Sequence, residues 1–149
     1  MNLVLDAWAV LAWLRGESAG EAVRDLVAWA EGDTEAGERI RGRFADIDGE
    51  PTLSTNLINL GEVFYILGRR YGEREADETL AALSQAPIEV TPASRRIVWG
   101  AARLKMTHPL SYADAIAAST AQSKDAGLVT GDPELQRLPD VSILWLGDV

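Results

Sequence analysis

The sequence contains no cysteine and a single histidine, His108, among its 149 residues. The absence of cysteine excludes a disulfide framework, a thiolate metal site and a cysteine nucleophile. One histidine excludes a histidine-rich zinc site and leaves only His108 as the base of a serine-type triad. Because His108 precedes Pro109, we expect it in a surface turn. These absences exclude thiol chemistry and histidine-rich zinc sites, and they limit any triad to His108.

Long apolar runs are also missing, since none approaches the roughly 20 residues that a membrane-spanning helix needs. The segment from Met1 to Asp6 lacks the basic start and the long apolar stretch of a signal peptide. The apolar fraction of 47% and the charged fraction of 25% are near the averages of globular proteins, which excludes disordered, collagen-like and disulfide-scaffold classes. We therefore expect one soluble, cytoplasmic domain over residues 1–149, without membrane association.

Positive charge is scarce, because 14 lysines and arginines face 23 aspartates and glutamates, for a net charge of −9. Nonspecific nucleic-acid binders usually carry a basic face, since neutralising phosphates supplies most of their affinity. The acidic balance argues against a DNA-binding module, but not against an enzyme that meets nucleic acid through divalent cations. The pairs Arg69-Arg70 and Arg95-Arg96 could add affinity, although solvated surface is the commoner role of such pairs.

Short apolar strands alternate with amphipathic helices along the chain. We expect strands at 3–5, 51–55, 88–90, 127–130 and 141–145, and helices near 10–14 and over 20–30, 57–70, 73–84, 93–106 and 111–124. The charged, glycine-rich stretch 31–50 is expected to be a partly helical insertion. This alternation predicts a three-layer α/β/α fold, in which helices cover both faces of a central, mostly parallel sheet of four to five short strands.

Four carboxylates fall where such a sheet binds ligands. Asp6 ends the first strand and Asp132 follows the strand at 127–130, so both reach the crevice beyond the carboxyl ends of the strands. Glu62 and Asp114 belong to helices. Each acid has a purely structural alternative. Asp6 and Asp132 suit helix N-caps, Asp114 completes a capping box with Ser111, and Glu62, on a largely apolar helical stretch, could pair with a distant arginine. One such acid is a weak indication, but four together favour a shared site.

A cluster of carboxylates is the ligand set that Mg²⁺ or Mn²⁺ prefers, with substrate phosphates and waters completing the shell. Such an ion lowers the pKa of a bound water and stabilises charge that builds on phosphate oxygens. One or two ions would offset the charge of the four acids and create a cationic spot. The sequence therefore predicts a metal-assisted attack on a phosphodiester.

Four ordered segments resemble a known family: Leu3-Val4-Leu5-Asp6, Asn59-Leu60-Gly61-Glu62-Val63, Leu110-Ser111-Tyr112-Ala113-Asp114-Ala115 and Val129-Thr130-Gly131-Asp132-Pro133. The chain resembles a PIN domain over nearly its whole length, and most of all the small VapC-type ribonuclease toxins of prokaryotic toxin–antitoxin pairs. The resemblance implies an RNA-cleaving Mg²⁺ or Mn²⁺ site whose acids are Asp6, Glu62, Asp114 and Asp132, with Thr130 as a supporting hydroxyl. It also implies a homodimer and an antitoxin partner.

Two features depart from the family pattern. Ala7-Trp8 follows Asp6 where members often carry serine, threonine or asparagine, and the stretch 31–50 is longer than in compact members. A different class of function is a degenerate PIN-like module that binds RNA or protein without cleaving; the missing polar residue favours it and the intact set of acids opposes it. A small metal-dependent phosphatase of unrelated α/β fold is a third possibility.

Three tryptophans, Trp8, Trp13 and Trp29, lie on the first two expected helices. Tryptophan is normally a core or interface residue, and its enrichment favours a protein-binding groove over base stacking. The family resemblance implies that an antitoxin segment lies across these helices.

Overall fold

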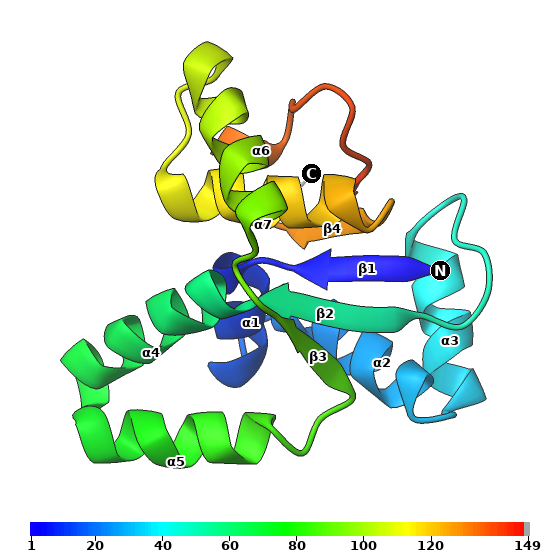
Figure 1. Cartoon of the computed structure of the whole chain (residues 1–149). Helices are drawn as coiled ribbons and strands as arrows, with labels where there is room; N and C mark the ends of the chain where they lie inside the picture. The colour runs from blue at the N-terminus through cyan, green and yellow to red at the C-terminus, as the bar shows by residue number, and fades with distance from the viewer. Residues whose placement is uncertain (148–149) are drawn as a thin grey trace.

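The computed structural model describes residues 1–147 (Figure 1). Within them one all-parallel sheet has the strand order β3-β2-β1-β4-β5. The strands are β1 (Asn2–Leu5), β2 (Thr52–Asn56), β3 (Ile88–Thr91), β4 (Gly127–Thr130) and β5 (Ile143–Trp145). The expected fold class is confirmed, and the sheet is parallel throughout the described residues.

Helices cover both faces of the sheet, as the alternation along the chain predicts (Figure 1). One face carries α1 (Ala7–Leu14), α2 (Gly20–Ala30), α3 (Thr34–Arg43), α4 (Leu57–Tyr71) and α5 (Glu73–Leu83). The other carries α6 (Arg95–Thr107), α7 (Tyr112–Ser123) and the 3₁₀ turn η1 (Pro133–Leu135). Within residues 1–147 no helix has the length and apolar character to span a membrane.

Strand β1 shows why its sequence is apolar without alternation. Leu3 and Leu5 pack into the core beneath α1 to α5, whereas Val4 packs into the core on the α7 side. All three side chains are at most 3% exposed. A parallel strand covered on both faces has no solvent side, so it needs no polar positions.

The charged stretch 31–50 is partly helical, as expected. It contains α3, which begins at the N-cap Asp33 and buries Ala36 and Ile40 in the core. Arg39 donates two hydrogen bonds to the carboxylate of Asp25 in α2, at 3.1 and 2.9 Å. The polar composition of this helix therefore reflects one solvent face and one ion pair.

The order of the strands fixes where a ligand can bind. From the central β1 the chain steps outward to β2 and β3, and it then returns over the opposite face through α6 and α7 to β4, beside β1. The connections after β1 and β4 therefore leave to different faces. In open α/β sheets this topological switch point, at the carboxyl ends of the strands, is the usual ligand crevice.

Candidate metal centre

Asp6 lies directly after β1 and is only 2% exposed. One carboxylate oxygen accepts a hydrogen bond from the backbone N–H of Ala9 at 2.8 Å, so the expected N-cap is present. The other oxygen accepts a hydrogen bond from the hydroxyl of Thr130 on β4. The pKa of Asp6 is raised to about 7, mainly by burial, with smaller contributions from the nearby carboxylates of Asp114 and Asp132, while the hydrogen bonds from Thr130 and Ala9 act in the opposite direction. Capping explains one oxygen of this acid, not its burial beside other acids.

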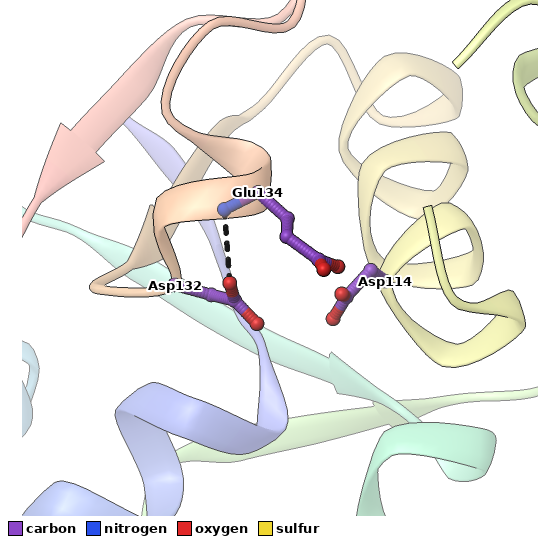
Figure 2. Close-up of side chains that lie close together, drawn as sticks. All are labelled: Asp114, Asp132 and Glu134. Atoms are coloured by element: carbon purple, nitrogen blue, oxygen red, sulfur yellow. Dashed lines mark hydrogen bonds between the residues drawn. The ribbon is translucent and has the colours of Figure 1, made fainter. Parts of the chain in front are cut away.

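Thr130 links β1 to the turn that follows β4. Its buried hydroxyl also accepts a hydrogen bond from the backbone N–H of Asp132 at 3.0 Å. The Asp132 carboxylate in turn accepts from the N–H of Glu134 at 3.0 Å and so caps η1, as the following proline predicts (Figure 2). The chain Asp6–Thr130–Asp132 therefore connects the two strand ends through hydrogen bonds.

Asp114 lies in the first turn of α7. The Ser111 hydroxyl accepts a hydrogen bond from the Asp114 backbone N–H at 3.2 Å, so Ser111 is the expected helix cap. The Asp114 side chain, however, lies among other acids: burial first, and then the charges of Asp132, Glu62 and Glu134, raise its pKa to about 6. A role in the helix cap alone does not explain why the Asp114 carboxylate lies among other acids.

Three of these acids converge. Carboxylate oxygens of Asp114, Asp132 and Glu134 all lie within 4.8 Å of one another, and Figure 2 shows the three side chains turned toward a common space. Glu134 is the member that sequence reasoning missed, because an exposed acid in the first turn of a helix is usually a solvated charge. The available signal was Pro133, which starts a tight turn and brings Glu134 back beside Asp132.

Glu62 lies on α4 and is half-buried, outside this set of three. Burial and the charge of Asp132 raise its pKa. Its apolar helical neighbours Ile58 and Tyr65 are 42% and 50% exposed, so the largely apolar helical stretch around Glu62 faces solvent and Glu62 lies at a rim. Within residues 1–147 it forms no ion pair, which opposes the alternative of a distant arginine partner.

Asn59, one turn before Glu62, joins α4 to the start of α7. Its side-chain N–H donates to the carbonyl of Ala113 at 3.0 Å, directly before Asp114. Its Oδ1 is buried and has no hydrogen-bond partner among the described residues. A buried polar atom of this kind normally has a partner, so Asn59 Oδ1 is a free hydrogen-bond acceptor beside the start of α7 among the described residues.

The residues fit a hard divalent cation. The converging donors are carboxylate oxygens, and their spread of 4.8 Å is close to the roughly 4.2 Å between opposite ligands of an octahedral Mg²⁺. Like charges at this spacing repel, which is one reason why the pKa of Asp114 is raised. Asp114 and Asp132 could hold such an ion directly, with the exposed Glu134 and the half-buried Glu62 at the rim. Asp6 is linked to Asp132 through the Thr130 hydroxyl.

The three tryptophans of the first two helices have different surroundings. Trp29 is 5% exposed, and the guanidinium of Arg41 lies 4.7 Å from its ring centre, so it belongs to the core and not to a groove. Trp13 and Leu14 border a hollow of about 360 Å³ against α5. Trp8 packs beside the acid cluster, against the backbone of Gly131.

His108 is not part of the acid cluster. It ends α6, and its Nδ1 lies 3.2 Å from the carbonyl oxygen of Leu104 in the same helix. The residue is half-buried at this turn, and its local hydrogen bonding agrees with a structural role.

Comparisons with known proteins agree with this architecture. The sequence matches the PIN domain family over residues 3–141, whereas a search of the curated proteins finds no match. Similar solved structures include VapBC-1 from nontypeable Haemophilus influenzae, with a TM-score of 0.67, 17% identity and 98% of each chain covered. A toxin–antitoxin complex from Klebsiella pneumoniae has a TM-score of 0.61, 18% identity and 99% of each chain covered.

A third similar structure is VapC20 of Mycobacterium tuberculosis, which is described as a Sarcin-Ricin loop cleaving toxin. It has a TM-score of 0.60 and 18% identity, with 89% of this chain and 92% of that chain covered. At sequence identities this low, the structural similarity shows a shared fold and nothing more. The match of the sequence itself to the family over almost its full length goes further: the chain belongs to the PIN domain family.

Proposed function

We propose that this protein is a metal-dependent endoribonuclease and the toxin of a type II toxin–antitoxin pair. The observation that carries the proposal is the convergence of Asp114, Asp132 and Glu134, beside the hydrogen-bonded pair Asp6–Thr130, at the switch point of the sheet. Membership of the PIN domain family supports a nuclease. The similar VapC20 structure, described as a Sarcin-Ricin loop cleaving toxin, supports RNA as the substrate class.

The acids have distinct tasks in this proposal. Asp114 and Asp132 hold the cation, Glu62 faces it from α4, and Asp6 fixes the Thr130 hydroxyl. When bound, Mg²⁺ or Mn²⁺ would lower the pKa of a bound water and stabilise negative charge on the phosphate. Because its pKa is about 6, Asp114 gives up its proton readily near neutral pH and becomes an anionic ligand.

Exposed aromatic residues paired with arginines support contacts to single-stranded RNA. The Arg69 guanidinium lies 5.5 Å from the ring centre of Tyr65, which follows Glu62 by one turn of α4. On α6, Arg95 lies 6.0 Å from the ring centre of Trp99, which is 52% exposed. Aromatic rings stack on unpaired bases and arginines contact phosphates, so such pairs can attract RNA to an acidic protein.

A cleavage assay tests the proposal. We expect the purified protein to cut unstructured and hairpin RNA in Mg²⁺ or Mn²⁺, and to stop when EDTA is added in excess. Asp132→Asn, purified in parallel, controls for contaminating ribonuclease. Cleavage that persists in EDTA, or that is equal in wild type and Asp132→Asn, contradicts the metal mechanism.

A second candidate function is RNA or protein binding without cleavage. The observation that favours it is Ala7, a buried residue without a hydroxyl directly after Asp6. RNA binding without any cleavage in either metal would support this alternative. The phosphatase of unrelated fold is excluded, because the chain belongs to the PIN domain family.

The proposed antitoxin contact lies at the hollow between α1 and α5. Trp13 and Leu14 form its apolar side, while Glu75 and Glu78 line the other. An antitoxin segment that fits would carry apolar side chains together with lysine or arginine. The similar structures of VapBC-1 from Haemophilus influenzae and of the toxin–antitoxin complex from Klebsiella pneumoniae support such a partner.

Co-expression with the product of a small adjacent gene tests this contact. Trp13→Ala and Leu14→Ala should weaken the complex, whereas Trp99→Ala on α6 should not. If both α1 variants fold and bind the partner as wild type does, the proposed groove is wrong.

We also propose that the protein forms a homodimer. The structure supports this with exposed apolar residues on α4 and α6, among them Ile58 at 42% and Met106 at 80% exposure. Light scattering at tens of micromolar should give twice the mass of the chain, and a monomer at that concentration contradicts the proposal.

A further inference from the structure

Trp8, in the first turn of α1, is in unusually close contact with Gly131, between β4 and η1. A Cβ atom added at Gly131 would lie 2.2 Å from Cη2 and 2.3 Å from Cζ3 of the indole. Such distances are far inside van der Waals contact, so no other amino acid fits unless the ring moves. Gly131 does not have a positive φ, so the glycine is required by this contact and not by its backbone conformation.

Gly131 lies between two residues of the proposed site. Gly131 is the peptide link between Thr130, whose hydroxyl donates to Asp6, and Asp132, whose backbone N–H donates back to that hydroxyl. Asp132 then caps η1 and lies with Asp114 in the acid cluster. A displacement of Gly131 would therefore move Asp132 and the start of η1 together.

We propose that Trp8 is a positioning residue for the metal centre. Its indole packs on the buried Gly131 backbone and sets the direction in which Asp132 and Glu134 approach Asp114. The indole offers no oxygen ligand, so it acts through the turn and not on the ion itself. In this chain, in which Ala7 supplies no polar group after Asp6, side-chain packing takes the place of a hydrogen bond in ordering the site. The inference rests on the proposed metal site.

A double-mutant cycle at the two positions separates packing from chemistry. Gly131→Ala inserts a methyl group into the ring, whereas Trp8→Phe retracts the ring edge and makes room for that methyl. We expect Gly131→Ala to weaken Mn²⁺ binding by about 10- to 100-fold, the range measured for residues that orient metal ligands. Combining Gly131→Ala with Trp8→Phe should recover most of this loss. The affinity is read from the electron paramagnetic resonance signal of unbound Mn²⁺, and melting curves are recorded alongside.

Gly37→Ala supplies a matched control for tight glycine–tryptophan packing. A Cβ at Gly37 in α3 would lie 2.8 Å from the ring of Trp29, so this variant compresses a similar contact away from the acid cluster. This variant should lower the melting temperature and leave the Mn²⁺ affinity unchanged. Equal losses of Mn²⁺ affinity in Gly37→Ala and Gly131→Ala would overturn the proposal, because they would reflect general destabilisation.

Trp8→Leu covers the case in which Gly131→Ala does not fold, since it removes the ring and inserts no atom into the turn. We expect this variant to bind Mn²⁺ more weakly than wild type while its melting transition stays cooperative. If wild type binds Mn²⁺ and Trp8→Leu binds it equally well, the positioning role is wrong and the metal site stands. If wild type binds no Mn²⁺, the proposed function fails, and the inference with it.

Discussion

The two ends of the central sheet both carry clusters of acids, and they use them differently. At the amino ends of the strands a hollow of about 660 Å³ is lined by Asp46, Asp48, Asp125 and Asp140. All four are exposed, and three of them have positive φ values: 63° at Asp46, 49° at Asp125 and 60° at Asp140. Aspartate tolerates this backbone conformation better than most residues do. Turn geometry therefore explains Asp46, Asp125 and Asp140.

At the carboxyl ends the acids are withdrawn from solvent and brought together. Asp6 is 2% exposed, and Asp114 and Asp132 are half-buried. Among the described residues, the three acids whose oxygens lie within 4.8 Å of one another are Asp114, Asp132 and Glu134, all at this end. The number of acids and the size of a hollow therefore say little about function. Burial and convergence, which cost free energy without a cation, identify the site.

The largest expected difference between the two ends is in catalysis. Asp114→Asn and Glu62→Gln remove charges that a cation needs and keep the side-chain shape, so we expect RNA cleavage to fall on the order of a thousandfold, or about 4 kcal/mol of barrier. Asp125→Asn is the matched control, because asparagine also tolerates a positive φ. Initial rates with a labelled RNA in Mg²⁺ measure the effect. Full activity in the first two variants would leave the non-catalytic module as the better account.

A metal-induced rise in thermal stability should also separate the two ends. An ion that binds only the folded state, present at 100 times its Kd, stabilises that state by about 2.7 kcal/mol. We expect Mn²⁺ to raise the melting temperature of wild type by several degrees and that of Asp114→Asn far less. Asp140→Asn, at the amino end, should respond as wild type does. Equal shifts in all three proteins would mean that Mn²⁺ binds elsewhere.

The sequence predicts the order of the elements well, because strands buried on both faces and amphipathic helices leave local patterns. It predicts much less of the stretch 31–50. The burial of Ile40 and the ion pair between Asp25 and Arg39 depend on where α3 packs. The residue types alone do not indicate that packing position.

The site was predictable in part for a similar reason. Asp6 and Asp132 follow strands, so topology alone brings them to one edge of the sheet. Their N-cap geometry, which sequence reasoning treated as an alternative to a site, occurs together with the clustering. The contact of Trp8 with Gly131 joins residues 123 positions apart in the chain and leaves no local pattern.

A smaller effect concerns the stability of the metal-free protein. Because the pKa of Asp114 is raised to about 6 by folding, the folded state binds an extra proton between about pH 4 and 6, and its stability falls as pH rises through that window. Asp114→Asn removes this loss. At pH 7.5 in EDTA, Asp114→Asn should therefore melt at a higher temperature than wild type. We expect its free energy of unfolding to be larger by only roughly 1 kcal/mol, because solvent screens the charge of a half-exposed carboxyl.

The pH dependence supplies the check on this prediction. The advantage of Asp114→Asn should shrink as the pH falls below 6 and vanish only well below the ordinary pKa of 3.8, where the wild-type carboxyl is protonated in both states. Asp140→Asn should show no such trend. A constant advantage at every pH would indicate a change in packing and not the removal of charge repulsion.

The smallest expected effect is at Glu134, the acid of the carboxyl-end cluster that most resembles the acids at the amino end. Like the amino-end acids Glu134 is exposed, yet its carboxylate lies within the converging set. Glu134→Gln keeps the backbone N–H that donates to Asp132, so the cap of η1 should persist. An exposed charge contributes under about 1 kcal/mol, so we expect Mn²⁺ affinity to fall about two- to fivefold. Glu50→Gln, an exposed acid at the amino end, should leave it unchanged. If Glu134→Gln instead lost as much Mn²⁺ affinity as Asp114→Asn, Glu134 would be a direct ligand. An exposed acid could then serve as a ligand in this site, and burial would not distinguish the ligands.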